Sequence, residues 1–79
     1  MYYVYALRSK NSRNLFVGST QNVEQRLKQH NAGIVRLTAG KGPFTVVYTE
    51  EHPRKQDAFD KERYYRSPKG KAELSAKIK

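Results

Sequence analysis

The chain of 79 residues is long enough for one domain and too short for two, so we expect a single domain over residues 1–79. It contains no cysteine, which excludes disulfides and thiolate zinc sites, and no apolar run approaches the ~20 residues that a membrane-spanning helix needs. The net charge of +9 is large for this size and indicates a polyanionic partner, with a merely solubilising surface as the alternative.

The positive charge is concentrated in the first part of the chain. Residues 1–49 contain seven Lys and Arg side chains and a single acidic one, Glu24. Together with the interleaved tyrosines, this favours a nucleic acid as the partner, bound through release of counterions from its phosphates. The first residues lack the basic, apolar, small-residue order of a signal peptide, so we expect a cytoplasmic protein without membrane contact.

Two segments near the N-terminus are predicted to form an antiparallel hairpin. Residues 2–7 are rich in aromatic and β-branched side chains and end at a polar run, residues 8–14, which is the expected loop. Residues 15–19 are the expected partner strand, and Gly18 there permits a bend or the close approach of another group. Val4 and Leu7 need not share a face, so both faces of the hairpin should be covered.

A helix is predicted over residues 23–30. Asn22 is a suitable N-cap, Gln25 three residues later is a capping-box partner, and residues 31–33 supply the stop. The helix therefore follows the second strand directly.

The same helix carries an apolar stripe and a polar one. Val23 and Leu27 are four residues apart and should face the core. Arg26 and His30 have the same spacing and form a neighbouring stripe. A guanidinium and an imidazole therefore border the buried face.

The middle of the chain alternates between loop and strand signals. Residues 33–43, rich in glycine and basic side chains, predict a flexible basic loop that meets a ligand. Residues 44–49 predict a third strand, closed by residues 50–53. Pro53 is suited to the start of the next helix, because the first helical N–H has no partner there.

The second predicted helix spans about residues 54–66. Ala58, Glu62 and Tyr65 share one stripe of it. An ionised carboxylate among apolar neighbours needs a cation, a metal or hydrogen bonds to remain there. Glu62 is therefore the acidic residue that we single out, with an ordinary ion pair to Arg66, four residues on, as the alternative.

The C-terminal segment should add a short helix. Residues 67–70 contain serine, proline and glycine and are expected to interrupt the preceding helix. Residues 71–79 then form a terminal helix anchored by Leu74 and Ile78.

An ordered set of motifs runs through these elements at characteristic spacings: Tyr3-Val4-Tyr5, Phe16-Val17-Gly18, Arg26 with His30, the stretch 38–44, and Ala58 with Lys61-Glu62. In these residues the chain resembles the GIY-YIG nuclease domain, in particular the small standalone bacterial branch related to the N-terminal nuclease module of nucleotide-excision repair. Either tripeptide alone is a weak signal, but the ordered set is specific.

The resemblance implies an α+β fold with a three-stranded antiparallel sheet flanked by helices. It further implies a divalent-metal-dependent endonuclease that hydrolyses DNA phosphodiester bonds with Mg²⁺ or Mn²⁺. DNA is then the partner, and a monomer is the default state.

The family pattern also implies roles for individual residues. Glu62 would hold the metal, Arg26 would contact the scissile phosphate, and Tyr5 would activate water. His30 stands where the family places a side chain that positions phosphate or nucleophile. Tyr3, Phe16 and Gly18 occupy structural positions of the two tripeptides.

Three positions depart from the pattern. Phe16 replaces the tyrosine of the second tripeptide, which removes a phenol from the site. Tyr3 replaces a glycine, and Ser19 stands where the repair module has a lysine. A module that binds nucleic acid with weakened or lost catalysis is therefore the alternative function, and a protein-interaction domain with incidental charge is a third.

The individual residues also have simpler interpretations. Tyr5 could be a core strand residue, Arg26 a solvated helix residue and His30 a partner of the helix dipole. Four further basic residues are either generic phosphate contacts or plain surface: Arg36, Lys41, Lys69 and Lys71.

Overall fold

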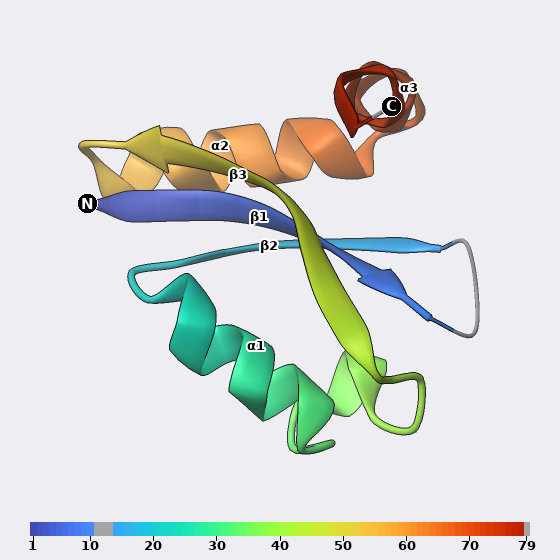
Figure 1. The fold of residues 1–79 in the computed structure, drawn as a ribbon. Helices are drawn as coiled ribbons and strands as arrows, with labels where there is room; N and C mark the ends of the chain where they lie inside the picture. The colour runs from blue at the N-terminus through green and yellow to red at the C-terminus, as the bar shows by residue number, and fades with distance from the viewer. Residues whose placement is uncertain (11–13, 79) are drawn as a thin grey trace.

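The computed structural model describes residues 1–10 and 14–78. Within these residues the elements follow in the order β1 (Tyr2–Ser9), β2 (Leu15–Thr20), α1 (Val23–Asn31), the 3₁₀ helix η1 (Arg36–Thr38), β3 (Phe44–His52), α2 (Lys55–Arg66) and α3 (Pro68–Ile78). Figure 1 shows a three-stranded sheet with helices on both sides. The predicted α+β fold with an antiparallel sheet is confirmed.

The first strand is the centre of the sheet. The strand order is β2-β1-β3, and both pairs are antiparallel. The predicted hairpin of the first two strands is therefore present, although part of its loop, residues 11–13, lies outside the described residues. Opposite β3, the ladder is irregular between Ala6 and Leu7. Because β1 has neighbours on both sides, its central residues are fully buried.

Helices cover the two faces of the sheet separately. Val4 packs in a core with Tyr65 of α2 and Leu74 of α3, on one face. Leu7 packs in a second core with Phe44 on the other face, against the α1 side chains. In Figure 1, α1 lies on one side of the sheet and α2 and α3 on the other. The expectation that both faces of the hairpin are covered is confirmed.

The third strand is longer than its β-propensity indicates. It continues to His52, where a strand end at residue 49 was expected. The charged residue Glu50 pairs with Val4 in the ladder, and its carboxylate accepts hydrogen bonds from the hydroxyls of Tyr48 (2.6 Å) and Tyr65 (2.7 Å). These donors allow a carboxylate to stand where the sequence signals a strand end.

The N-terminus of α1 has the predicted cap. The Asn22 side chain accepts a hydrogen bond from the Gln25 backbone N–H at 3.0 Å. The other half of the capping box is replaced, because the Asn22 N–H donates to the Thr20 hydroxyl at 3.2 Å. Val23 and Leu27 face the core as predicted.

The break between α2 and α3 is shorter than expected. Only Ser67 separates them, and Pro68 is the first residue of α3. Proline suits this position because the first helical N–H needs no partner. The Ser67 hydroxyl accepts the Gly70 N–H at 3.1 Å, so residues 68–70 are helical rather than an interruption. Leu74 is buried and Ile78 packs beside it, as predicted.

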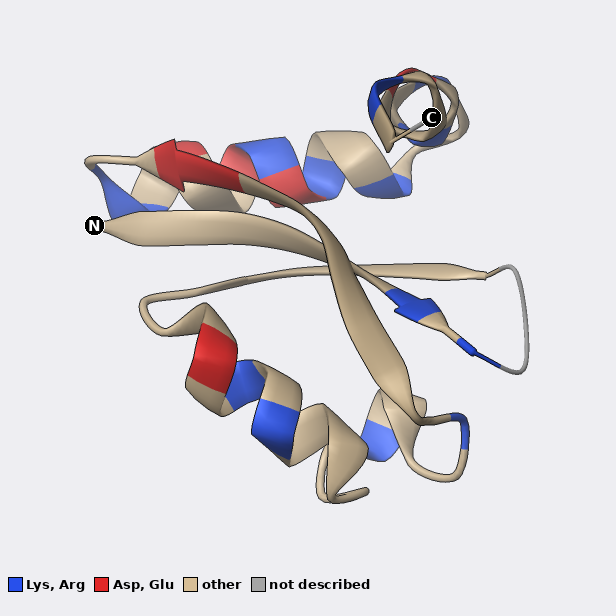
Figure 2. Ribbon diagram, viewed as in Figure 1, with Lys and Arg blue, Asp and Glu red and all other residues tan. Residues whose placement is uncertain are grey.

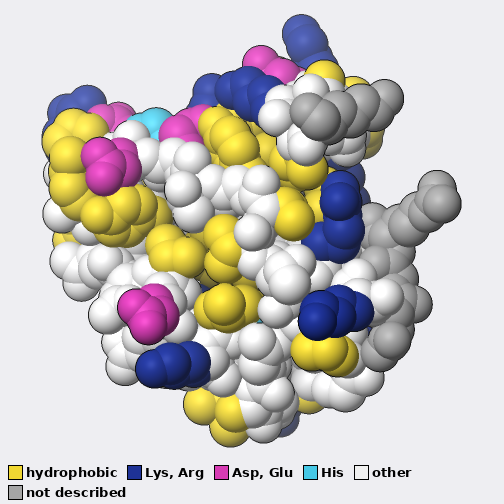
Figure 3. Space-filling model, in the orientation of Figure 1, with side chains coloured by type: hydrophobic (Ala, Val, Ile, Leu, Met, Phe, Trp, Pro, Cys, Tyr) yellow, Lys and Arg dark blue, Asp and Glu magenta, His cyan; other side chains and the backbone are white. Residues whose placement is uncertain are grey.

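Charge is unevenly distributed over the fold. Figure 2 shows acidic residues gathered on the C-terminal part of β3 and on α2, with one more at the start of α1, while basic residues stand alone around η1 and the end of β1. On the face drawn in Figure 3, acidic side chains lie mainly on the left and basic ones mainly on the right. Among the described residues, no helix has the length and apolar character to span a membrane.

Candidate active site

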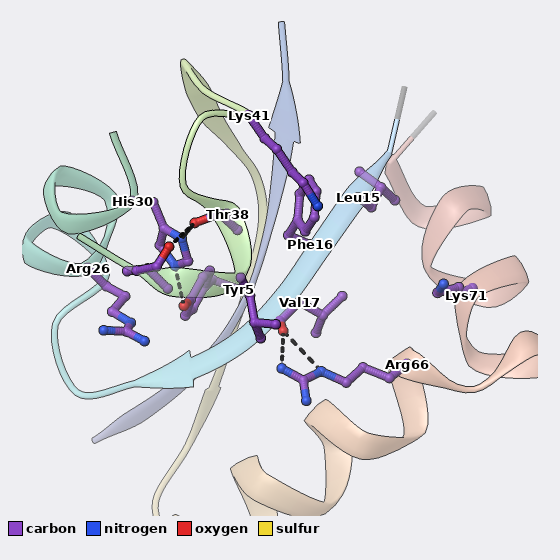
Figure 4. A pocket seen from close by; sticks show the side chains of 12 residues that line it. Tyr5, Leu15, Phe16, Val17, Arg26, His30, Thr38, Lys41, Arg66 and Lys71 are labelled. Carbon is purple, nitrogen blue, oxygen red and sulfur yellow. Dashed lines mark hydrogen bonds between the residues drawn. The ribbon is translucent and has the colours of Figure 1, made fainter. Parts of the chain in front are cut away.

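A hollow of about 470 Å³ lies along the edge strand β2, with residues of α1 and η1 on one side and Arg66 and Lys71 on the other (Figure 4). Tyr5 and His30 line it, together with the apolar side chains of the second tripeptide. Among the described residues that line it, none is acidic and four are Lys or Arg: Arg26, Lys41, Arg66 and Lys71. The hollow is therefore suited to an anion that carries an apolar part, such as a nucleotide unit of a nucleic acid.

Tyr5 reaches the hollow because of the glycine opposite it. Tyr5 of β1 pairs directly with Gly18 of β2, and its side chain is only 4% exposed. A Cβ atom on Gly18 would lie 2.5 Å from the Tyr5 hydroxyl oxygen and 2.7 Å from Cζ. Gly18 lies within β2, so its role here is to leave room for the phenol ring and not to end the strand.

A chain of polar contacts joins three elements at the hollow. The Tyr5 hydroxyl lies 3.0 Å from His30 Nε2, and His30 Nδ1 lies 2.7 Å from the Thr38 hydroxyl. His30 is 6% exposed and Thr38 2% exposed. Both nitrogens of the imidazole are therefore engaged inside the protein, and all three residues of this chain of contacts border the hollow.

The electrostatic surroundings fix the protonation of this chain. Burial raises the pKa of Tyr5, and the nearby Arg26 guanidinium opposes that rise. Burial also lowers the pKa of His30, and Arg26 lowers it further. Since the ordinary values are about 10 and 6.5, Tyr5 is protonated and His30 neutral at neutral pH. The pair is thus a phenol beside an uncharged imidazole.

Glu62 lies behind the edge strand, on the α2 side. The residue is 7% exposed, and its Oε1 accepts a hydrogen bond from the Ser19 hydroxyl at 2.6 Å. Oε2 accepts from Arg66 Nη2 at 2.9 Å. Arg66 also donates to the Val17 carbonyl and lines the hollow. The carboxylate is therefore joined to the hollow through Arg66, and its negative charge contributes to the raised pKa of Tyr5.

The donor set at Glu62 is compatible with a hydrated divalent cation. Among the described residues, no group of three or more His, Cys, Asp and Glu side chains is close enough together to hold a metal. Mg²⁺ keeps several of its waters and is bound through one or two carboxylates together with substrate phosphates, so Glu62 could supply one protein ligand to such an ion. At present the Arg66 guanidinium supplies the positive charge at Oε2, where a cation would bind.

The other predicted residues divide into those at the hollow and those outside it. Lys41 and Lys71 line it, and the Lys41 ammonium lies 5.6 Å from the centre of the Phe16 ring. Arg36 and Lys69 are exposed and do not line it. Of the motif positions, Phe16 lines the hollow, whereas Tyr3 lines a smaller one near the start of α1.

Three residues of the site were not recognised as such from the sequence. Thr38 and Ser19 hydrogen-bond to His30 and Glu62, and Arg66 bridges Glu62 to β2. Thr38 lies in the motif stretch before the third strand but carried no assigned role, and Ser19 counted only as a missing lysine. The spacing of Glu62 and Arg66 is the one signal that pointed to their ion pair.

Comparisons with known proteins show which family the chain resembles in sequence and in structure. Residues 1–75 match the GIY-YIG catalytic domain. The chain is 42% identical over 65 residues to a UPF0213 protein of Clostridium perfringens (81% of this chain, 69% of that protein) and 35% identical over 74 residues to one of Streptococcus sanguinis (92% and 84%). It is also similar to the solution NMR structure of a UPF0213 protein from Bacillus halodurans, with a TM-score of 0.58, 34% identity and coverage of 96% and 84%.

Proposed function

Because this chain belongs to the GIY-YIG family, we propose that it is a divalent-metal-dependent endonuclease that hydrolyses DNA phosphodiester bonds in the hollow beside Tyr5. One observation carries the proposal. A phenol, an imidazole and a guanidinium from two elements meet at a basic hollow, and the buried carboxylate of Glu62 on α2 is linked to it through Arg66.

The first step is the attack of water on phosphorus. Burial makes Tyr5 a weak acid, so it is poorly suited to act as a preformed phenolate. A concerted transfer avoids this difficulty: the phenol oxygen takes a proton from the attacking water while the phenol proton passes to His30 Nε2, 3.0 Å away. A bond forms from the water oxygen to phosphorus, the bond to one sugar oxygen breaks, and that oxygen takes a proton from solvent.

The charge that develops on the phosphate needs positive partners. Arg26 lines the hollow, and its planar guanidinium matches the geometry of two phosphate oxygens. A divalent cation held by Glu62 would supply further positive charge to offset that of the phosphate. Lys41 and Lys71 border the same hollow and would bind neighbouring phosphates of the strand.

A nicking assay tests the proposal. Supercoiled plasmid is incubated with the protein, with and without Mn²⁺, and open-circular product is measured. We expect metal-dependent nicking that falls about 100-fold or more in Arg26→Ala, by analogy with the loss of one donor to a developing oxyanion. Glu62→Gln should lose nicking as well, since the amide is a far weaker cation ligand than a carboxylate.

Matched variants control for general effects of charge and stability. Lys28→Ala removes an exposed cation from the same helix as Arg26, and Glu51→Gln neutralises an exposed carboxylate of β3. Both should retain nicking. A folded parent protein that fails to nick at high concentration with Mn²⁺ would falsify the enzyme proposal.

The second candidate is a nucleic-acid-binding module that has lost turnover. Phe16 favours it, because this side chain lines the hollow and provides no hydroxyl where the family pattern has one. Phe16→Tyr separates the two functions. A large gain in nicking indicates a weakened active site, whereas continued inactivity together with salt-sensitive DNA binding indicates the module.

A further inference from the structure

The imidazole of His30 bridges two hydroxyl groups, and its proton can stand on either nitrogen. With the proton on Nδ1, the ring donates to the Thr38 hydroxyl and Nε2 accepts from the Tyr5 hydroxyl. With the proton on Nε2, both hydrogen bonds reverse. Only the first arrangement leaves Nε2 able to take a proton from Tyr5.

The surroundings of the two hydroxyls distinguish these arrangements. Thr38 Oγ1 lies 3.5 Å from the Val35 carbonyl, which can take the hydroxyl proton when the oxygen accepts from His30. At the other end, the Tyr5 hydroxyl shares the hollow with the Arg26 guanidinium, which has donors and no acceptor. If His30 donated to that hydroxyl, the phenol proton would have no acceptor among these groups.

We propose that Thr38 is a positioning residue: its hydroxyl accepts the Nδ1 proton of His30 and thereby keeps Nε2 free to receive the proton of Tyr5. The role rests on the proposed function, in which Tyr5 relays a proton from water. It assigns a specific task to the turn that follows α1.

The backbone holds Thr38 in place for this task. Thr38 is the last residue of η1, and its N–H donates to the Val35 carbonyl at 3.1 Å. Its own carbonyl accepts the Lys41 N–H at 3.1 Å. The His30 ring is also fixed by edge contact with Phe44, at 6.0 Å between ring centres. The hydroxyl and the ring therefore meet through positions set by α1, η1 and β3.

The tautomer of His30 can be measured without DNA or metal. In ¹⁵N-labelled protein, long-range ¹H–¹⁵N correlation spectra distinguish a protonated Nδ1 from a protonated Nε2. We expect the wild-type protein to carry the proton on Nδ1. Thr38→Val has nearly the same shape without the hydroxyl, so the buried Nδ1–H would lose its acceptor and the proton should move to Nε2.

Two further variants control the experiment. Thr38→Ser restores a hydroxyl and should restore the Nδ1-protonated ring. Thr45→Val makes the same chemical change at an exposed position of β3 and should leave the tautomer unchanged. A wild-type ring protonated on Nε2, or a folded Thr38→Val protein that keeps the proton on Nδ1, would overturn the proposal.

Nicking rates then connect the tautomer to the reaction. Thr38→Val should lower the turnover rate about 10-fold or more, with DNA affinity unchanged and Thr38→Ser close to wild type, because the loss concerns a proton transfer. A tautomer that follows Thr38 in a protein without nicking activity would leave the positioning role intact and refute the nuclease proposal alone. Nicking by Thr38→Val at the wild-type rate would refute the positioning role.

Discussion

Replacing Gly18 by alanine tests how the tyrosine is accommodated. The new Cβ atom would lie 2.5 Å from the Tyr5 hydroxyl oxygen and 2.7 Å from Cζ, distances that real Cβ atoms do not adopt. The ring is buried between β2 and α1 and has little room to move. Overpacking of this kind costs about 1–3 kcal/mol, and we expect that loss in the free energy of unfolding.

Urea denaturation measures the cost. For a domain of this size the slope is about 1 kcal/mol/M, so Gly18→Ala should lower the midpoint by about 1 M or more. The displaced phenol should also lose its contact with His30, and nicking should fall with it.

A double-mutant cycle identifies the clashing group. Tyr5→Leu removes both the hydroxyl oxygen and Cζ, the two nearest atoms. In that background Gly18→Ala should cost close to nothing, because an alanine in a strand is otherwise no worse than a glycine. An equal cost of Gly18→Ala in both backgrounds would refute the reasoning, since the penalty would then come from the backbone of β2.

Three further predictions follow from the site. The pKa of His30 is lowered in the folded protein, so the neutral imidazole contributes stability above about pH 6.5, and this stability is lost as the pH falls below about 6.5. Urea midpoints measured at about pH 7.5 and about pH 5.5 should therefore differ less in His30→Gln than in the wild type. Arg66→Ala removes the cation that now neutralises Glu62, so Mn²⁺ should bind more tightly, and an unchanged affinity in electron paramagnetic resonance titrations would contradict this. Lys71→Ala should reduce the salt dependence of DNA binding by about one unit of slope, whereas Lys69→Ala, which does not line the hollow, should have a smaller effect in the same fluorescence anisotropy titration.

Local chemistry was sufficient to predict the three strands and three α-helices in their order, but not the 3₁₀ helix η1, which lies in a predicted loop. The β-branched and aromatic runs mark all three strands, and Asn22 marks the start of α1. Two element bounds differ most from the prediction. β3 extends through Glu50 because two tyrosine hydroxyls, one of them from α2, bind its carboxylate. The last helix begins at Pro68 and not at residue 71, because proline suits the first helical position and the Ser67 hydroxyl accepts the Gly70 N–H.

The functional side chains were less accessible to prediction than the elements. The apolar stripe of the second helix singles out Glu62, but only the family pattern distinguishes Tyr5 from an ordinary core residue and Arg26 from an ordinary surface residue. The bond from Ser19 to Glu62 joins residues 43 positions apart in sequence. No helical or strand period connects such positions, so Ser19 was interpreted only as the loss of a lysine.

Residues 33–43, between α1 and β3, show that the site depends on more than the sheet. The composition of this segment predicts a flexible loop, yet hydrogen bonds tie it to α1 and to β1. Thr38 bonds to His30, the Lys41 carbonyl accepts the Ser9 hydroxyl at 2.6 Å, and the Pro43 carbonyl accepts the backbone N–H of Lys10 at 3.0 Å. Lys41, which we propose contacts a phosphate, and Thr38, which we propose orients the imidazole, therefore lie in one segment fixed to both α1 and β1. In the proposed mechanism, a shift of this segment would change phosphate contact and proton transfer together, and would couple substrate binding to the chemistry of Tyr5.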